Sequence, residues 1–282
     1  KAFADLLLKH RIETYALSAD LTIGANKYEK GKAFVVTTDQ TQYRMVRSMF
    51  EKVTSFYDSV FYDASTWTMA LAYGVPHDPI GASIKISKGD KIKSQDLVAT
   101  PPPVAKSTYA YLIDWNEYNA SRALYYLLSK NVYVKAAFKP FATTVNGTKR
   151  QFGYGTLMIP VADQDLSADE LFTAMQEASA TSGLEIYSVA TGFNLEGVDL
   201  GSGNVRTVQM PKVVMLVGDG VAATDAGAHW FLLDSKLKMP ITKVNTSQFG
   251  QLRISDYNTL ILVSGNYGIL GEAGVSKIKA WV

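Results

Sequence analysis

The alternation of apolar and polar positions is clearest in the last third of the chain. Apolar runs at 212–217 (KVVMLV) and 259–263 (TLILV) predict two buried strands, and 241–244 predicts a shorter one. A helix is expected between the first run and the short strand, over about 224–236. Continuous apolar strands that alternate with a helix and end in glycine loops are typical of a parallel sheet covered on both faces.

Two loops of small residues follow the long apolar runs. In parallel sheets, ligands bind beyond the carboxyl ends of the strands, so a small-molecule site in this half of the chain is expected there. The candidate ligand-binding residues are Gly218, Asp219 and Gly220 in the first loop, and Ser264, Gly265, Asn266 and Tyr267 in the second.

A second α/β pattern precedes this region. Strands are predicted at 109–113, 132–137, 155–161 and 185–189, and helices at 116–128, capped by Asn116, and 167–179. Ser167 and Glu170 have the spacing of a capping box at the start of the second helix. The order β-α-β-β-α-β predicts another α/β layer unit.

The first hundred residues are less regular. We expect a helix at 2–9, strands at 12–17 and 33–37, and a helix capped by Asp39 or Thr41 that runs to about residue 53. The following polar stretch, 85–106, contains three consecutive prolines and is predicted to be a linker or an edge crossing.

The fold class is therefore α/β. The predicted division is an α/β region over 1–206, with sub-units 1–100 and 107–193 joined by the proline-rich linker, followed by a unit over 207–282. The stretch 194–209 is glycine-rich and lacks a period, and it is expected to be the domain boundary.

Composition removes several classes of function. The 282 residues are 47% hydrophobic and 19% charged, as in an ordinary globular protein, and the net charge of +2 gives no reason to expect nucleic-acid binding. The absence of cysteine excludes disulfides, thiolate metal sites and thiol nucleophiles. Apolar runs are shorter than the roughly 18 to 20 residues that a membrane span requires.

Histidine patterns are weak. His10 and Glu13 have a zinc-ligand spacing, but His77 and His229 lie in no companion pattern, so we interpret the match as coincidence. His229 and Asp225 are one helical turn apart and are interpreted as a surface pair. His77 and Asp78, flanked by prolines, indicate a turn.

The glycine loops resemble two known motifs incompletely. Gly218-x-Gly220-x-x-Ala223 is similar to a dinucleotide fingerprint, but the second strand ends without an acidic residue, which favours a tight turn. Ser264 precedes its glycines instead of lying between them, so a backbone turn is favoured over a nucleophile elbow.

Aromatic and acidic residues are concentrated between residues 57 and 73. Such a cluster is consistent with a sugar or peptide groove and equally with interdomain packing, and both interpretations remain open. The cluster consists of Tyr57, Asp58, Tyr62, Asp63, Trp67 and Tyr73.

Several segments together resemble one family. Residues 7–15 (LLKHRIETY), 32–36 (KAFVV, leading to Gln40) and 61–67 (FYDASTW) resemble the region that follows the catalytic domain in large secreted bacterial zinc carboxypeptidases of the carboxypeptidase A type. The run 213–220 (VVMLVGDG), with Ala226-Gly227, Trp230 and Leu233-Asp234, is similar to their C-terminal module. That module resembles the class I glutamine amidotransferase fold.

The resemblance has specific implications. The C-terminal unit would be a partial, mostly parallel, flavodoxin-like sheet of an incomplete glutamine amidotransferase-like domain. The zinc ligands and catalytic glutamate would precede Lys1, so zinc would belong to the parent protein and this chain would hold no cofactor. The partners would be the parent's own N-terminal catalytic domain and its peptide substrates, in an extracytoplasmic location.

We therefore expect a non-catalytic C-terminal portion of a zinc carboxypeptidase-like protein. One alternative is a stand-alone α/β ligand-binding or interaction module. A third, least favoured, is that the chain itself hydrolyses a substrate through Ser264 or an acid–base pair. Because the chain begins and ends inside predicted helices, it is expected to be a piece of a longer protein. The last helix would expose Val275, Ile278 and Val282 on one apolar stripe. We expect this edge to be frayed, or to be buried against a neighbouring molecule, as in a homo-oligomer.

Overall fold

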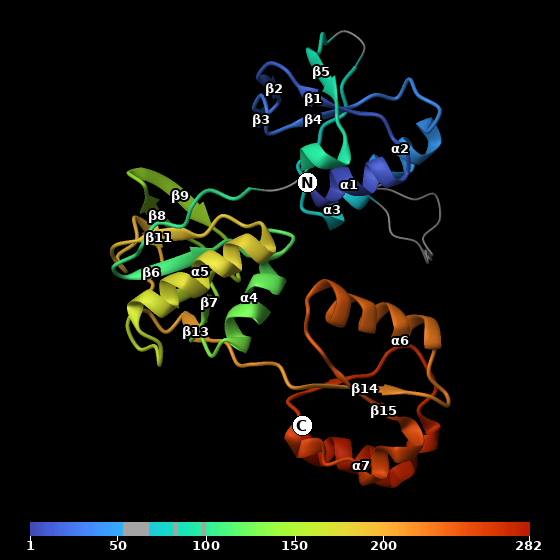
Figure 1. Ribbon diagram of the computed structural model, residues 1–282. Helices are drawn as coiled ribbons and strands as arrows, with labels where there is room; N and C mark the ends of the chain where they lie inside the picture. Colours follow the sequence, from blue (N-terminus) through green and yellow to red (C-terminus); the bar gives the residue numbers. More distant parts are fainter. Residues whose placement is uncertain (53–67, 82–83, 98–99) are drawn as a thin grey trace. The chain divides into compact units, whose positions relative to one another are not determined.

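The computed structural model of the chain (Figure 1) describes residues 1–52, 68–81, 84–97 and 100–282. It is a mixed α/β protein with several sheets, one of them parallel. Its contacts divide it into two compact units, Lys1–Thr100 and Pro101–Val282. The predicted proline triplet opens the second unit.

The first unit is built on a three-stranded antiparallel sheet. Its strand order is β4-β1-β5, with bounds β4 (Phe34–Val36), β1 (Thr14–Leu17) and β5 (Lys88–Lys91). Strands β2 (Leu21–Ile23) and β3 (Asn26–Tyr28) form a separate hairpin. Residues 85–106 were expected to be a linker or an edge crossing, and the first of these is wrong at β5, which is an edge strand of this sheet. β5 is polar and mostly exposed, so its sequence shows no strand pattern. It is a strand because it forms hydrogen bonds with β1.

Helices pack their apolar sides together in this unit. They are α1 (Ala2–Lys9), α2 (Tyr43–Phe50) and α3 (Met69–Ala72), with a 3-10 turn at Ser94–Leu97. Their shared core consists of Phe3, Leu7, Ile12, Val46, Met49 and Ala70. The predicted caps at Asp39 and Thr41 are wrong, because α2 begins after Gln42 without a side-chain cap. Of the predicted aromatic cluster, Tyr73 packs on this core, and its other members lie outside the described residues.

The second unit contains a five-stranded antiparallel sheet of order β11-β6-β10-β7-β13. Its strands are β11 (Tyr187–Val189), β6 (Ala110–Ile113), β10 (Leu157–Pro160), β7 (Lys135–Ala137) and β13 (Val205–Thr207). Together with α4 (Ala120–Ser129) and α5 (Ala168–Ser182), the first four strands follow the predicted β-α-β-β-α-β order. This arrangement is a split β-α-β, or ferredoxin-like, topology.

Helices α4 and α5 cover one face of this sheet (Figure 1). The core between the helices and the sheet includes Tyr111, Ile113, Leu127, Leu157, Ile159, Leu171 and Met175. The predicted capping box is confirmed, with Ser167 and Glu170 bonded reciprocally at the start of α5. The predicted cap at Asn116 is wrong. Its amide instead donates to Asp114 Oδ1 over 3.1 Å, and α4 begins after Asn119.

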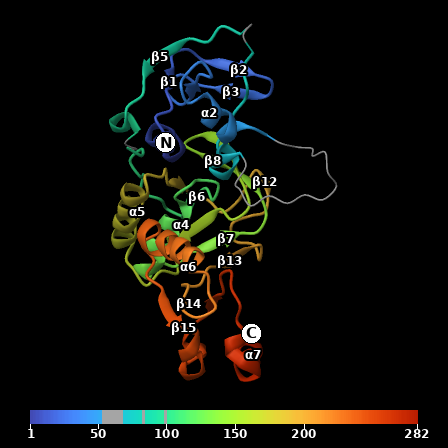
Figure 2. The same ribbon diagram turned by 90° about the vertical axis from the view of Figure 1, so that its right-hand side faces the viewer.

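A second layer covers the opposite face. It consists of β8 (Phe141–Val145), β9 (Thr148–Phe152) and β12 (Glu196–Gly197), of which β12 pairs with β8 (Figure 2). Their apolar side chains bury the other side of the sheet, in a cluster that contains Phe141, Phe152, Met158, Tyr187, Leu200 and Val205. The hairpin was not predicted. The stretch 194–209, expected to be a domain boundary, contains the short strands β12 and β13, which pair with β8 and β7.

The parallel sheet has the strand order β15-β14-β16. The strands are β14 (Val213–Val217), β15 (Thr242–Asn245) and β16 (Thr259–Ile261), joined by α6 (Ala223–Trp230) and two 3-10 turns at Thr246–Gln251 and Ile254–Asp256. Helix α6 and the final helix α7 (Gly271–Trp281), which follows a 3-10 turn at Gly268–Leu270, lie on opposite faces (Figure 1). Alternation along β14 explains this, because Met215 packs with Ala226 of α6 whereas Leu216 packs with Phe249 in the cluster that Ile278 joins.

Two helix predictions require correction. The expected helix over 224–236 is α-helical only to Trp230 and continues as a π-helical segment, Phe231–Lys236. The expected exposed stripe on the last helix is wrong at Ile278, which packs inward, although Val275 is 46% exposed. Across the described ranges, none of the helices is long and apolar enough to cross a membrane.

Candidate functional site

The first glycine loop is a tight turn directly after β14. The amide of Val221 donates to the carbonyl of Gly218 over 3.1 Å and closes it. Gly218 and Gly220 have φ values of 93° and 82°, a conformation in which a side chain is strained. A Cβ on Gly218 would also lie 2.6 Å from Asn245 Oδ1. These glycines are therefore required by the backbone itself.

The structure brings the two predicted loops together, because β14 and β16 are parallel neighbours whose carboxyl ends meet at one edge. Ala222 N donates to Ser264 O over 2.9 Å, and Asn266 N donates to Gly220 O over 2.7 Å. Val221 and Gly265 form an isolated antiparallel bridge. The loops thus use these backbone groups to bind each other.

The contact between the loops leaves no room for side chains. A Cβ on Gly220 would lie 2.2 Å from the carbonyl oxygen of Asn266, and one on Gly265 would lie 2.6 Å from that of Gly220. Both distances are below any ordinary van der Waals contact. Gly220 and Gly265 therefore allow the backbones of the two loops to pack directly against each other. Glycines in such a loop can also bind a phosphate, but here their absent side chains serve the packing of the loops.

Side-chain contacts reinforce the same turn. Thr246 Oγ1 donates to Asp219 O over 2.9 Å, which attaches the first loop to the end of β15. Tyr267 donates its hydroxyl to Val263 O over 2.8 Å, and burial raises the pKa of this phenol. The amide of Gly268 donates to Asn266 Oδ1 over 2.9 Å. The sequence analysis did not identify Asn245 and Thr246 as part of this turn. Their place at the carboxyl end of β15, a neighbouring strand of the same sheet, is what could have indicated it.

A shallow hollow of about 390 Å³ lies beside the second loop. Its floor belongs to the start of α7, and of the predicted site residues it includes Tyr267. The lining residues are Tyr267, Gly268, Gly271, Glu272, Val275, Ser276 and Lys279. Among them Glu272 and Lys279 supply opposite charges, whereas Val275 supplies exposed apolar surface.

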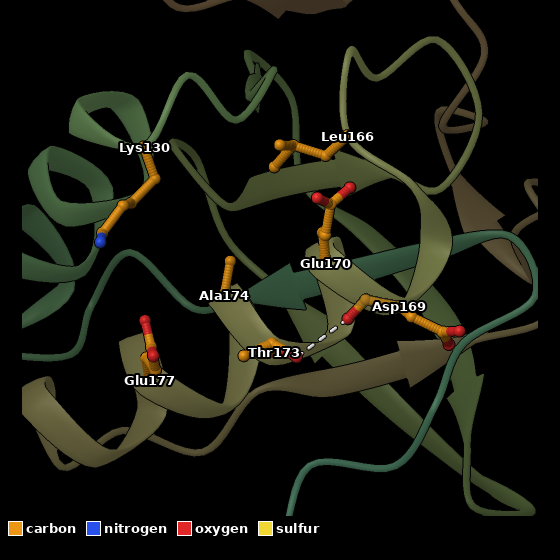
Figure 3. Close-up of a pocket in the computed structure, with 7 residues that line it drawn as sticks. All are labelled: Lys130, Leu166, Asp169, Glu170, Thr173, Ala174 and Glu177. Carbon is orange, nitrogen blue, oxygen red and sulfur yellow. Dashed lines mark hydrogen bonds between the residues drawn. The ribbon is translucent and has the colours of Figure 1, made fainter.

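Another hollow, of about 340 Å³, lies between the end of α4 and the first turns of α5 (Figure 3). Its carboxylates already have partners. Glu170 accepts from the amide and hydroxyl of Ser167 over 2.9 and 2.7 Å, which lowers the pKa of its carboxyl. Asp169 pairs with Lys106, and Glu177 accepts from Tyr126. The bonds of Glu170 stabilise the start of α5, and the bond of Glu177 to Tyr126 joins α5 to α4, so these carboxylates have structural roles.

The three histidine patterns found in the sequence do not form paired sites, because the groups next to each histidine bind other partners. Glu13 binds Lys91 Nζ over 2.6 Å and accepts from the Tyr15 hydroxyl over 2.8 Å, and the bond to Lys91 lowers the pKa of the Glu13 carboxyl. The ring of His229 contacts the backbone carbonyl of Asp225 over 2.9 Å, not its carboxylate. Asp78, beside His77, accepts from the Tyr28 hydroxyl and the Asn26 amide over 2.7 and 2.8 Å, and so holds the β2–β3 hairpin.

Within the residues that the structure describes, no three His, Asp or Glu side chains come close enough together to hold a metal ion. Comparisons with known proteins add no identification: no protein-family model, curated protein or solved structure matches the chain. The two glycine loops at the carboxyl edge of the parallel sheet are therefore the candidate functional site.

Proposed function

We propose that this chain is the non-catalytic C-terminal portion of a zinc carboxypeptidase-like protein. In this proposal residues 207–282 form part of a glutamine amidotransferase-like, flavodoxin-like sheet. The observation that supports it is the all-parallel order β15-β14-β16 with glycine loops at the carboxyl edge. A flavodoxin-like sheet begins with the same neighbours, its second strand, its first and its third. The resemblance of 213–220 to the carboxypeptidase C-terminal module points the same way.

The proposed role is binding, positioning or stabilisation of the parent's own catalytic domain. In the loops at the carboxyl edge, the backbone carbonyl of Ser264 and the backbone amide of Asn266 are used to hold the two loops together. The ring of His229 contacts the backbone carbonyl of Asp225, and Ser264 accepts from Ala222 N through its backbone carbonyl. Zinc-dependent hydrolysis of peptides would take place in the catalytic domain, in an extracytoplasmic location.

The encoding gene tests this proposal directly. The reading frame upstream of Lys1 should encode a His-x-x-Glu motif and a later His, preceded by a signal peptide. A reading frame that opens close to Lys1 would overturn the proposal and favour the alternative, a stand-alone ligand-binding or interaction module.

A physical test uses the two proteins together. The separately produced catalytic domain, mixed with this chain, should bind it and shift its thermal unfolding upward, because a ligand that binds only the folded state stabilises that state. Carboxypeptidase domains of unrelated sequence provide the control. Equal shifts with both would contradict a specific accessory role.

A further inference from the structure

Helix α6 turns a small residue toward the parallel sheet and its large apolar residues toward solvent (Figure 1). Ala226 is the one residue of α6 that is buried, and the π-helical segment Phe231–Lys236 buries none of its residues. Where the two meet, the side chains of Trp230, Phe231 and Leu232 are 41%, 53% and 48% exposed. These three consecutive side chains form one exposed apolar surface, the α6 patch. Apolar surface of this size, rimmed by polar groups, is typical of an interaction site.

Three lysines accompany the α6 patch. Lys243 Nζ, on β15, lies 3.9 Å from the centroid of the Trp230 ring, and Lys236 Nζ lies 5.4 Å from that of Phe231. The third, Lys238, follows two residues after Lys236. We call Lys236, Lys238 and Lys243 the patch lysines. Between Trp230 and Lys243 they are opposed by a single aspartate, so this stretch of chain is positively charged as well as apolar.

The patch lysines have no partner within the protein for their charge. None of them takes part in an ion pair or a side-chain hydrogen bond among the residues that the structure describes. Lys277 provides a comparison, since it too lies over a ring, 5.2 Å from the centroid of Phe249. Its Nζ, however, donates to the carbonyls of Phe249 and Gly250 over 3.0 and 2.8 Å. Lys277 thus stabilises the fold, whereas the patch lysines can bind an external anion.

Lys238 occupies a backbone conformation that favours glycine. Its φ is 60°, in the left-handed region, where a side chain costs free energy. The turn itself is held by backbone bonds, from Leu237 N to Leu232 O over 3.0 Å and from Met239 N to Leu233 O over 2.9 Å. The first of these bonds ties the turn to the α6 patch. Glycine would form this turn more readily, so the turn does not require the lysine side chain.

We propose that the α6 patch and its lysines bind the surface of a membrane that is rich in anionic phospholipid. At such a surface Trp, Phe and Leu side chains enter the boundary of the acyl chains, while neighbouring lysines reach the lipid phosphates. The positive charge of the patch is complementary to the negative charge of this surface. Binding of single-stranded nucleic acid is less favoured, because bases stack on free ring faces and each ring here already has an ammonium group over one face. This inference is independent of the proposed accessory role.

Vesicle binding by the purified 282-residue chain tests the proposal. The protein is sedimented with sucrose-loaded vesicles of phosphatidylcholine, with or without an equal part of phosphatidylglycerol. We expect saturable binding to the anionic vesicles that weakens at high salt, and at least about tenfold weaker binding to phosphatidylcholine alone. Equal binding to both kinds of vesicle overturns the proposal. Binding to neither overturns it too, and binding of a labelled single-stranded oligonucleotide in that case would assign the patch to nucleic acid.

Fluorescence shows which part of the chain enters the lipid. Phospholipids that are brominated on their acyl chains quench a tryptophan only when its ring reaches the apolar layer. The wild-type protein should be quenched by anionic vesicles that contain these lipids. Trp230→Phe keeps an apolar ring at this position, so it should still bind the vesicles but lose the quenching. Quenching that persists unchanged in Trp230→Phe would place the contact elsewhere and overturn the proposal.

Two variants and two controls assign the binding to its residues. Phe231→Ser should weaken binding to the anionic vesicles by about fivefold or more through loss of apolar burial, and Lys243→Gln by about fivefold through loss of one charge. Phe193→Ser and Lys139→Gln remove an exposed ring and an exposed charge outside the patch, and both should bind as the wild type does. Unchanged binding in Phe231→Ser or in Lys243→Gln contradicts the proposal.

Lys238→Gly separates binding from folding. Glycine relieves the positive φ at this position, so the thermal midpoint should stay the same or rise. Loss of the charge should nevertheless weaken binding to the anionic vesicles by about fivefold. The variant therefore tests the patch even if Phe231→Ser does not fold. A Lys238→Gly protein that binds these vesicles as tightly as the wild type would contradict the proposed part of the patch lysines.

Discussion

The five-stranded antiparallel sheet and the three-stranded parallel sheet are both α/β layers, but they bury their strands to different extents. Every residue of β6 and β10 is buried, since helices cover one face and the β8–β9 hairpin covers the other. In the parallel sheet, four of the five residues of β14 are buried, whereas β15 and β16 are exposed or half-buried throughout.

The two sheets are therefore stabilised by different kinds of contact. The antiparallel sheet is stabilised by large apolar clusters on both faces, so its integrity depends on side-chain packing. The parallel sheet has small clusters, and its carboxyl edge depends on backbone contacts between glycines. We expect side-chain truncation to be most damaging in the first sheet and glycine replacement to be most damaging in the second.

The largest effect is expected from Leu171→Ala. Leu171 is fully buried between α5 and the antiparallel sheet, so its truncation should lower the free energy of unfolding by about 2–5 kcal/mol. Leu262→Ala is the control, because Leu262 is 45% exposed beside the parallel sheet and should change stability by about 0.5 kcal/mol or less. Urea unfolding measures both. Equal losses of unfolding free energy in the two variants would contradict the expectation that side-chain packing matters more in the antiparallel sheet.

Gly220→Ala should come next. Its positive φ and the backbone oxygen 2.2 Å from the added Cβ predict a loss of about 1–3 kcal/mol, together with altered amide shifts in the 264–268 loop. Gly250→Ala is the matched control, since nothing lies within 4 Å of its added Cβ. A Gly220→Ala protein as stable as the wild type would show that the loops do not need their close contact.

A smaller loss is expected from Ser167→Ala. This change removes the side-chain acceptor for the amide of Glu170 at the start of α5 and should cost about 1 kcal/mol. Ser276→Ala, on the exposed side of α7, should leave thermal stability unchanged. If the two variants unfold together, the capping box contributes nothing to the antiparallel layer.

The smallest expected effect is on stability at alkaline pH, and it depends on Tyr126. Burial and the hydrogen bond to Glu177 raise the pKa of Tyr126 to about 12, above its usual value. Because the folded state holds this proton more tightly, the resulting stability is present below about pH 10 and is lost as the pH rises toward 12. Tyr126→Phe should show a shallower decline in that window, whereas exposed Tyr154→Phe should not. Identical slopes for all three proteins would contradict the assignment.

Local signals predicted the antiparallel layer well. The Ser167–Glu170 capping box and the apolar strands at 109–113 and 155–161 depend on neighbouring residues, which a sequence displays directly. The β8–β9 hairpin was missed although Asn146-Gly147 is a hairpin turn signal, because the polar run in β9 masks its alternation. β5 likewise becomes a strand only through its pairing with β1.

The candidate site could be predicted only in part. The apolar runs indicated correctly that both glycine loops follow parallel strands. Bonds such as that of Asn266 N to Gly220 O depend on the register between β14 and β16, which no local pattern specifies.

The central claim, that this chain binds and positions but does not react, is tested most directly by peptide hydrolysis. The purified chain is incubated with zinc and blocked peptides that have free C-termini, and release of the terminal amino acid is followed with and without a chelator. The account predicts background release in both, unchanged by Ser264→Ala. Chelator-sensitive turnover, or turnover that disappears in Ser264→Ala, would contradict it.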